Sequence, residues 1–327
     1  MLGEKRKRTR GEARRRTDRA HGWVRHHTAL LLALLLAAGS ATAADPERVE
    51  WSPDWPRVRS WEKLGLVPLG ALSLVLAFGV QPPAEPRWRG GILFDDWLRG
   101  GLKGSTFSTQ QTFGKLGDYL FFTSVPLPLI VDVGIVTLGV HGNSDVALQM
   151  LLIDLQALGM SGVVTLGAER LVGRQRPYAS DCGADGQVRD SAGKPLYNHC
   201  HLPYDNESFF AGHPTTVTTM AGLTCAHHQH LPLYGGGVAD LAPCLLMVGA
   251  AGLTGVSRIV ADKHWASDVL VGWTVGALSG YVVPSLLHYG FTSHGSAAGA
   301  LGNGTLVAAP IPLVYPGGAG LGIVGVL

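Results

Sequence analysis

The most distinctive polar part of the sequence is an arginine-rich segment, Glu169–Pro177, at the end of a long apolar stretch. It carries three guanidinium groups, those of Arg170, Arg174 and Arg176. Proline disfavours helix at the residue before it, so Arg176 marks a helix end. Arg170 and Arg174 are four residues apart and share a helix face. One planar guanidinium group can bind two oxygens of a phosphate at once, so the segment predicts a phosphate site. For Arg174 the alternative is an ion pair with Glu169.

Two histidine-bearing segments follow. Gly212 and His213 precede a proline and an apolar stretch, which is typical of a helix start whose free N–H groups favour an anion. Further on, Arg258 closes one predicted helix, and His264 and Asp268 lie four residues apart on the next. A carboxylate at that spacing can orient an imidazole ring.

Together the three segments predict phosphoryl transfer. His264 would attack phosphorus, with Asp268 fixing the tautomer of its ring. His213 would donate a proton to the leaving oxygen. Cationic side chains and helix N–H groups supply the electrostatic stabilisation, so the chemistry requires no metal and no other cofactor. Taken singly, each of these residues would more often be a structural residue at a helix end; the combination favours catalysis.

The ordered pattern resembles the signature of the type 2 phosphatidic acid phosphatase (PAP2) superfamily, which is shared with bacterial acid phosphatases and vanadium haloperoxidases. That signature reads K-x6-R-P, P-S-G-H and S-R-x5-H-x3-D, and the resemblance covers about residues 118–290. The matching residues are Arg176, Pro177, Gly212, His213, Ser257, Arg258, His264 and Asp268. The resemblance implies an antiparallel helical bundle, a phosphohistidine on His264 and proton donation by His213. It also implies phosphate binding by Arg176, Arg258 and the N–H of Gly212.

Three positions depart from the signature, of which Phe210 in place of Pro is expected to be benign. Glu169 stands where the family has Lys, and Ala211 stands where it has Ser. Arg170 is adjacent to the first position, but one residue is about 100° around a helix. A lost hydrogen bond to a charged group costs about 1.5–3 kcal/mol, so the departures predict reduced activity.

The leading hypothesis is an exported phosphatase that acts on a phosphomonoester or pyrophosphate, with a lipid as the favoured substrate. A non-catalytic module that binds phosphorylated ligands is the alternative, favoured by Glu169 and Ala211. A vanadate-dependent oxidant is a third hypothesis, which the missing Lys disfavours.

The elements that must position these residues are helical. Helical stretches are predicted at Leu64–Val80, Tyr119–Val140, Asp145–Val172, Gly212–His227, Ala239–Val256 and His264–His288. We therefore predict an all-α fold, an antiparallel bundle of five or six core helices. A small C-terminal β-hairpin is expected from Thr305–Tyr315 and Leu321–Leu327, which flank a Pro-Gly-Gly turn.

The N-terminus is typical of a secretory signal. A basic stretch precedes the apolar run Ala29–Ala38 and a small-residue cleavage pattern around Ala41–Ala43. Residues 1–28 hold ten Lys and Arg against three Asp and Glu, a charge of +7, so the net charge of +2 leaves −5 for the rest. The basic charge therefore belongs to the leader, and nucleic-acid binding is disfavoured. An uncleaved membrane anchor is the alternative to a signal.

The chain divides into a signal peptide (1–43), a lead-in with one candidate membrane helix (44–117), the PAP2-like domain (118–290) and a Gly-rich tail (291–327). We expect the plasma (inner) membrane, or the periplasm or extracellular space, with the site facing outward. Three candidate spans precede Arg176, whereas a cleaved signal and an outward site need an even number. Hence one candidate is not a span, or the site faces inward, or the domain is soluble or peripheral.

The remaining cysteines and polar clusters are interpreted as structural or solvent-exposed. Cys182 is expected to pair with Cys200, and Cys225 either pairs with Cys244 or is a buried apolar residue. The histidines of His227–His230 are interpreted as a solvated loop rather than a metal site, and Asp95 and Asp96 as a solvated turn.

Overall fold

The computed structural model describes residues 49–290, except 184, 186, 190–194, 198–199 and 201–202, together with two C-terminal strands. The predicted signal peptide lies outside the described residues, as does the start of the Gly-rich tail.

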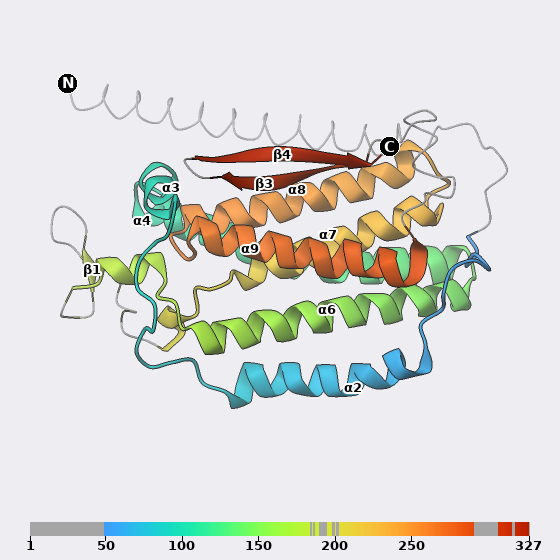
Figure 1. Ribbon diagram of the computed structural model, residues 1–327, viewed down its shortest axis with the longest axis horizontal. Coiled ribbons are helices and arrows are strands. Elements are labelled where there is room, and N and C mark those ends of the chain that lie inside the picture. Colours follow the sequence, from blue (N-terminus) through green and yellow to red (C-terminus); the bar gives the residue numbers. More distant parts are fainter. Residues whose placement is uncertain are drawn as a thin grey trace, which may run out of the picture. The chain divides into compact units, whose positions relative to one another are not determined.

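The described core is helical, as predicted. Its long elements are α2 (Ser60–Leu74) with η2 (Val75–Gly79), α4 (Phe107–Ser124) with α5 (Pro126–Pro128) and η3 (Leu129–Val140), α6 (Ser144–Val172), α7 (Gly212–His230), α8 (Val238–Val260), and α9 (Ala266–Ala277) with η6 (Leu278–Val282) and η7 (Ser285–Tyr289). All six predicted helical stretches are confirmed, with ends shifted by a few residues except at the start of α4. Consecutive long helices run antiparallel, so the ends that carry the three sequence segments meet (Figure 1).

Local sequence explains where several helices begin and end. The side chains of Thr106 and Asn143 accept hydrogen bonds from Thr109 N and Val146 N, which caps α4 and α6. Helix α6 ends at Gly173, whose φ of 61° is the left-handed conformation that glycine adopts without strain. Arg174 and Arg176 therefore lie in the loop directly after α6.

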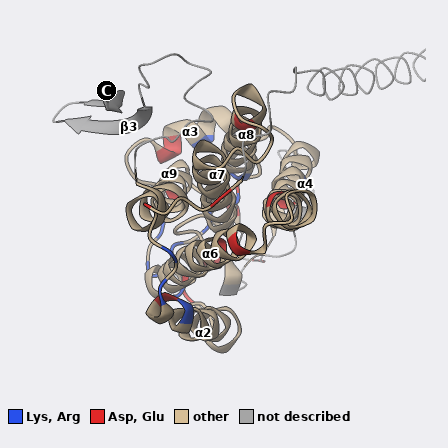
Figure 2. Ribbon diagram, turned by 90° about the vertical axis from the view of Figure 1, so that its right-hand side faces the viewer, with Lys and Arg blue, Asp and Glu red and all other residues tan. Residues whose placement is uncertain are grey.

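Helix α7 lies at the centre of the bundle, with α4, α6, α8 and α9 around it (Figure 2). It is polar for a central helix, and three of its threonine hydroxyls donate to the carbonyl four residues earlier; they are those of Thr215, Thr216 and Thr219. Helix α9 packs closely on α7 because its contact positions are glycine; a Cβ on Gly272 would lie 2.9 Å from Ala211 O. This close packing fixes the start of α7 against α9.

Five of the described helical segments are long and apolar enough to cross a membrane. They are Ser60–Gly79, Phe107–Val140, Ser144–Val172, Val238–Val260 and Ala266–Tyr289. Large apolar side chains cover their outer faces, as at Phe78 and Leu246, which are 78% and 74% exposed. Such faces are suited to lipid, and they support a membrane protein.

Shorter elements connect the helices. They are α3 (Asp95–Leu102), η4 (Pro177–Asp181), β1 (Val188–Arg189), β2 (Pro195–Tyr197) and η5 (Pro203–Asn206). A disulfide joins Cys182 to Cys200, as predicted, and a second joins Cys225 to Cys244, where the sequence left pairing and a buried apolar residue as alternatives. Strands β3 (Val307–Tyr315) and β4 (Gly318–Val326) occupy the tail. The hairpin expected from the sequence stays a prediction. An isolated pair of strands is only marginally stable in water.

Candidate functional site

The turn between α8 and α9 presents His264. Asp262 in this turn has a φ of 59°, a left-handed conformation that Asp tolerates better than most residues. Its carboxylate accepts two hydrogen bonds of 2.7 Å from Arg99 of α3, and Lys103 Nζ lies 3.1 Å away. Helix α3 therefore fixes the turn on which the predicted nucleophile stands.

The ring of His264 is buried and held at both nitrogens. Nδ1 lies 2.8 Å from the carbonyl oxygen of Ser208, which can only accept, so Nδ1 carries the proton. Nε2 then keeps its lone pair, and it lies 3.2 Å from Nη1 of Arg176. Burial, with the charges of Arg176 and Arg258, holds the pKa of His264 well below its usual value. The result is a neutral imidazole whose unprotonated nitrogen faces a guanidinium group.

Asp268 does not contact His264, so the predicted direct pairing is wrong. Its carboxylate accepts from the hydroxyl of Ser208 at 2.6 Å, from Trp265 N at 3.0 Å and from Arg174 at 2.5 Å. Because Ser208 also supplies the carbonyl that holds His264, Asp268 acts on the ring through Ser208. The four-residue spacing predicted a contact that needs both residues on one helix, but His264 lies before α9 begins.

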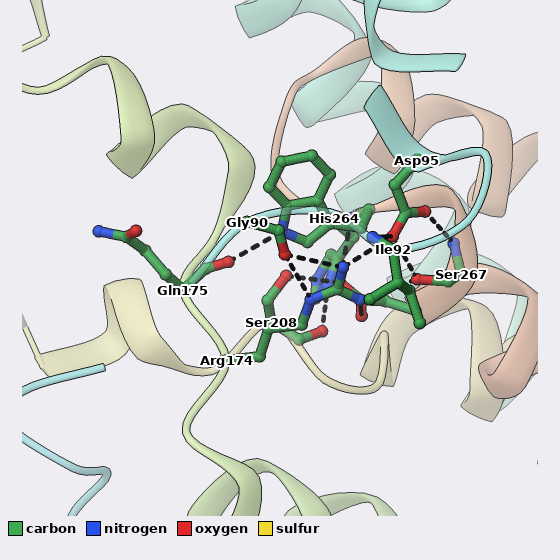
Figure 3. A network of polar contacts seen from close by, with 10 residues as sticks. Gly90, Ile92, Asp95, Arg174, Gln175, Ser208, His264 and Ser267 are labelled. Atoms are coloured by element: carbon green, nitrogen blue, oxygen red, sulfur yellow. Dashed lines mark hydrogen bonds and ion pairs between the residues drawn. The ribbon is translucent and has the colours of Figure 1, made fainter. Parts of the chain in front are cut away.

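Arg174 is a structural residue, which corrects its prediction as a phosphate ligand. Its side chain is fully buried and forms ion pairs with Asp95 at 2.7 Å and Asp268 at 2.5 Å (Figure 3). Its guanidinium also lies 4.0 Å from the ring centre of Trp88. Asp95 is 1% exposed and additionally accepts from the backbone and hydroxyl of Ser267, so the predicted solvated position is wrong for Asp95, whereas Asp96 is exposed.

Arg176 reaches the site from the loop after α6. Its Nε donates to Tyr204 O at 2.9 Å, and its Nη1 lies 3.2 Å from both Lys263 O and the ring of His264. The extended backbone before Pro177 turns the side chain away from α6 and toward the α8–α9 turn. Its guanidinium group therefore lies beside the ring of His264, and its phosphate-binding role stays a prediction.

Arg258 and His213 meet around a carboxylate of α4. Arg258 Nη1 lies 2.8 Å from Asp118 and donates to Gly114 O at 3.0 Å. Nε2 of His213 lies 3.2 Å from the same oxygen of Asp118. A Cβ on Gly117 would collide with Ser257 and crowd Arg258, so glycine there lets α4 approach the site.

The proton affinity of His213 is low in the unliganded site. Burial and the charge of Arg258 lower its pKa to about 3, against the opposing effect of Asp118. Arg176 and Lys263 lower the pKa of His213 further. Surrounding positive charge therefore disfavours the imidazolium form until an anion arrives.

The α6 side of the site differs from the expected arrangement. Arg170 forms an ion pair with Glu207 and donates to Val80 O at 2.7 Å, which turns it away from the site, so its predicted role as a phosphate ligand is not supported. Glu169 faces the start of α7, with Oε1 3.4 Å from where a Cβ of Gly212 would lie. Ala211 is fully buried. Its side chain belongs to a small apolar cluster with Ile259, Ala266 and Val269.

Three residues of this site escaped the sequence analysis: Ser208, Asp118 and Lys263. Asp118 offered a usable signal, because a carboxylate within an apolar helix is rare without a function. Lys263 directly precedes His264 and was hidden among the unspecified positions of the third motif. Ser208 holds His264 through its backbone carbonyl, which any residue carries, and its hydroxyl donates to Asp268 60 positions away, so no local pattern signals either contact.

The opposite end of the bundle holds a second polar cluster. His227 lies 2.8 Å from Asp154, and His228 lies 2.6 Å from Asp240 and 3.4 Å from Asp132. These histidines belong to α7 and are at most 3% exposed, so the predicted solvated loop is wrong. Among the described residues, no group of three or more His, Cys, Asp or Glu side chains is arranged to hold a metal ion.

Comparison with known proteins agrees with this geometry. Residues 150–291 match the family model of the PAP2 superfamily, which confirms the resemblance found in the three segments. Lipid A 1-phosphatase of Porphyromonas gingivalis is 28% identical over 156 residues. That alignment covers 47% of this chain but 27% of the relative, so the chain spans about a quarter of the curated protein. No solved structure matches the chain.

Proposed function

We propose that this chain, whose residues 150–291 belong to the PAP2 superfamily, removes phosphate from a membrane lipid through a covalent intermediate on His264. The observation that carries the proposal is the neutral imidazole whose Nε2 lies 3.2 Å from Arg176. A nucleophile beside a guanidinium group is the arrangement that phosphoryl transfer needs.

In the first step the phosphate binds between Arg176, Arg258 and the N–H groups that begin α7. Nε2 of His264 attacks phosphorus, and a P–N bond forms as the bond to the leaving oxygen breaks. Protonated His213 gives its proton to that oxygen, so the alcohol leaves neutral. The proton of Nδ1 stays on the ring, held by the carbonyl of Ser208.

In the second step, water attacks the phosphohistidine. Neutral His213 takes a proton from the water, the P–N bond breaks, and inorganic phosphate is released. His213 is protonated again at this point, and it loses that proton to solvent as the phosphate leaves, since its pKa is about 3 in the free site. The charge of bound phosphate offsets that of Arg258 and Arg176, which restores the proton affinity of His213, and Asp118 stabilises the imidazolium at 3.2 Å.

The apolar outer faces of five helices favour a lipid substrate held in the membrane. The name of the relative adds a phosphorylated glycolipid to the candidates. We extend the proposal to a phosphatase domain over residues 118–290 that lies in the plasma membrane with its site facing outward.

The test uses the full chain purified in detergent, with phosphatidate, a prenyl pyrophosphate and lipid A as substrates. We expect phosphate release from at least one of them, and His264→Ala should lower kcat about a thousandfold or more. Brief reaction with labelled substrate should leave an acid-labile, base-stable phosphoryl group on wild type and none on the variant. Equal release by wild type and His264→Ala would refute the proposal.

A non-catalytic phosphate-binding module is the second candidate. Two observations favour it: the carboxylate of Glu169 faces Gly212, and buried Ala211 offers no hydroxyl. Phosphate affinity without release from any of the three substrates would support this candidate instead.

A further inference from the structure

The described site lacks a cation where the family signature places its lysine. Glu169 occupies that position, and the two arginines that follow it, Arg170 and Arg174, form ion pairs with other residues. Arg170 is paired with Glu207, and Arg174 with Asp95 and Asp268. An incoming phosphate therefore finds a carboxylate on this side, and its third cation must come from another element.

Lys263 approaches the site from the other side. It directly precedes His264 in the α8–α9 turn, and its side chain is half-buried against α4. Its Nζ lies 3.5 Å from where a Cβ of Gly114 would be, beside the carbonyl to which Arg258 Nη1 donates at 3.0 Å. The ammonium group of Lys263 and the guanidinium group of Arg258 thus both lie beside Gly114 of α4.

This ammonium group has no partner in the part of the chain that the structure describes: Nζ of Lys263 forms neither a hydrogen bond nor an ion pair there. Burial and the charges of Arg258 and Arg176 lower the pKa of Lys263, against the opposing effect of Asp118. The positive charge of Lys263 lowers the pKa of His213 in turn. A half-buried, unpaired cation among other cations is unfavourable unless an anion joins it.

We propose that Lys263 is a phosphate-binding residue that supplies the cation missing at position 169, reaching the anion from the α8–α9 turn instead of from α6. The inference rests on the proposed function, because it assigns Lys263 to the same anion. Its ammonium group binds the phosphate oxygens on the side of Arg258 and α4, across from Glu169.

The backbone of Lys263 has a separate structural task. Its carbonyl accepts from Arg176 at 3.2 Å, and its N–H donates to Arg258 O at 3.0 Å. Both contacts survive any change of the side chain. Lys263→Met therefore removes the charge and keeps the turn, which makes it a clean test.

The experiment measures the affinity of the full chain for inorganic phosphate and orthovanadate by calorimetry, alongside kcat and KM. Lys263→Met should weaken both anions about tenfold to a hundredfold, as expected for loss of a charged hydrogen bond. Lys263→Arg should stay within about threefold of wild type. The control is Lys115→Met, at an exposed lysine of α4 one residue from Gly114, which should change nothing.

Two further readouts distinguish phosphate binding from a structural role. By NMR, Lys263→Met should raise the pKa of the His213 ring, since a neighbouring positive charge is gone. Adding Glu169→Lys to Lys263→Met should restore most of the anion affinity, because it returns a cation to the other side. If Lys263→Met does not fold, Lys263→Gln takes its place with the same expectations.

An anion affinity for Lys263→Met within twofold of wild type would overturn the inference. So would weakening by Lys263→Arg equal to that by Lys263→Met. Wild type that binds phosphate but releases none from any substrate would refute the proposed hydrolysis alone, and the affinities of the variants would still test Lys263.

Discussion

The two ends of the bundle treat buried charge in opposite ways. At one end Arg176, Arg258, Lys263 and His213 converge, and Asp118 is the carboxylate that Arg258 and His213 share. At the other end each interior histidine has its own acceptors, as in the 2.6 Å contact of His228 with Asp240. Around His213 the cations outnumber the carboxylates, whereas at the other end, called balanced here, His227 and His228 are each paired with a carboxylate.

This difference separates binding from architecture. A balanced cluster is complete in the free protein, so it stabilises the packing of α6, α7 and α8 and needs no ligand. A surplus of cations is costly in the free protein, and the cost is recovered when an anion binds. Charge balance is thus the feature that distinguishes the proposed site from the histidine-rich end of the bundle.

The largest effect on this comparison is expected from His213→Asn. Losing a general acid should lower kcat for an alkyl phosphate about a hundredfold to ten-thousandfold. With p-nitrophenyl phosphate, whose leaving group departs without a proton, the loss should be much smaller. Steady-state rates on both substrates measure this, and equal losses would remove His213 from the role of acid.

At the balanced end, Asp240→Asn should affect stability alone. The carboxylate accepts from His228 and from two backbone N–H groups, Tyr234 N at 3.0 Å and Gly236 N at 2.5 Å. Removing its charge should lower the free energy of unfolding by about 1.5–3 kcal/mol. Thermal melting in detergent measures the loss. A tenfold fall in kcat of the folded variant would mean that the balanced end takes part in the chemistry.

The smallest effect should come from Glu169→Lys in the otherwise wild-type chain. Adding a cation beside Gly212 should raise kcat/KM on a simple phosphomonoester about threefold to tenfold, because the α6 side then attracts phosphate. Glu169→Gln serves as the control that removes the negative charge without adding a positive one. Unchanged kcat/KM in both variants would place position 169 outside the phosphate site.

Sequence reasoning succeeded where a pattern was local. Apolar stretches located the helices, and the Arg-Pro, Gly-His and Ser-Arg pairs located the helix ends that meet. It also paired Cys182 with Cys200, since both lie in one polar loop. Each of these inferences needs only neighbouring residues.

Its errors share a physical cause, which is that contacts between distant segments decide the role of a charged residue. Arg174 resembles a phosphate ligand until Asp95, 79 positions earlier, is folded against it. Asp268 is four residues from His264 but binds Ser208, 60 positions away. The histidines of α7 appear to be a polar loop in sequence and are buried because Asp154 and Asp240 meet them. No local pattern encodes such partners.

One consequence follows from the number of helices before the site. The candidate spans Ser60–Gly79, Phe107–Val140 and Ser144–Val172 all precede Arg176, and three crossings leave Val49–Arg59 and His264 in different compartments. The Cys182–Cys200 bridge lies in the loops of the catalytic end, and such bridges persist in oxidising surroundings. If the proposed site faces the outside of the cell, Val49–Arg59 must therefore lie on the cytoplasmic side. Cleavage of a leader outside the cell would instead place Val49–Arg59 outside and the proposed site on the cytoplasmic side.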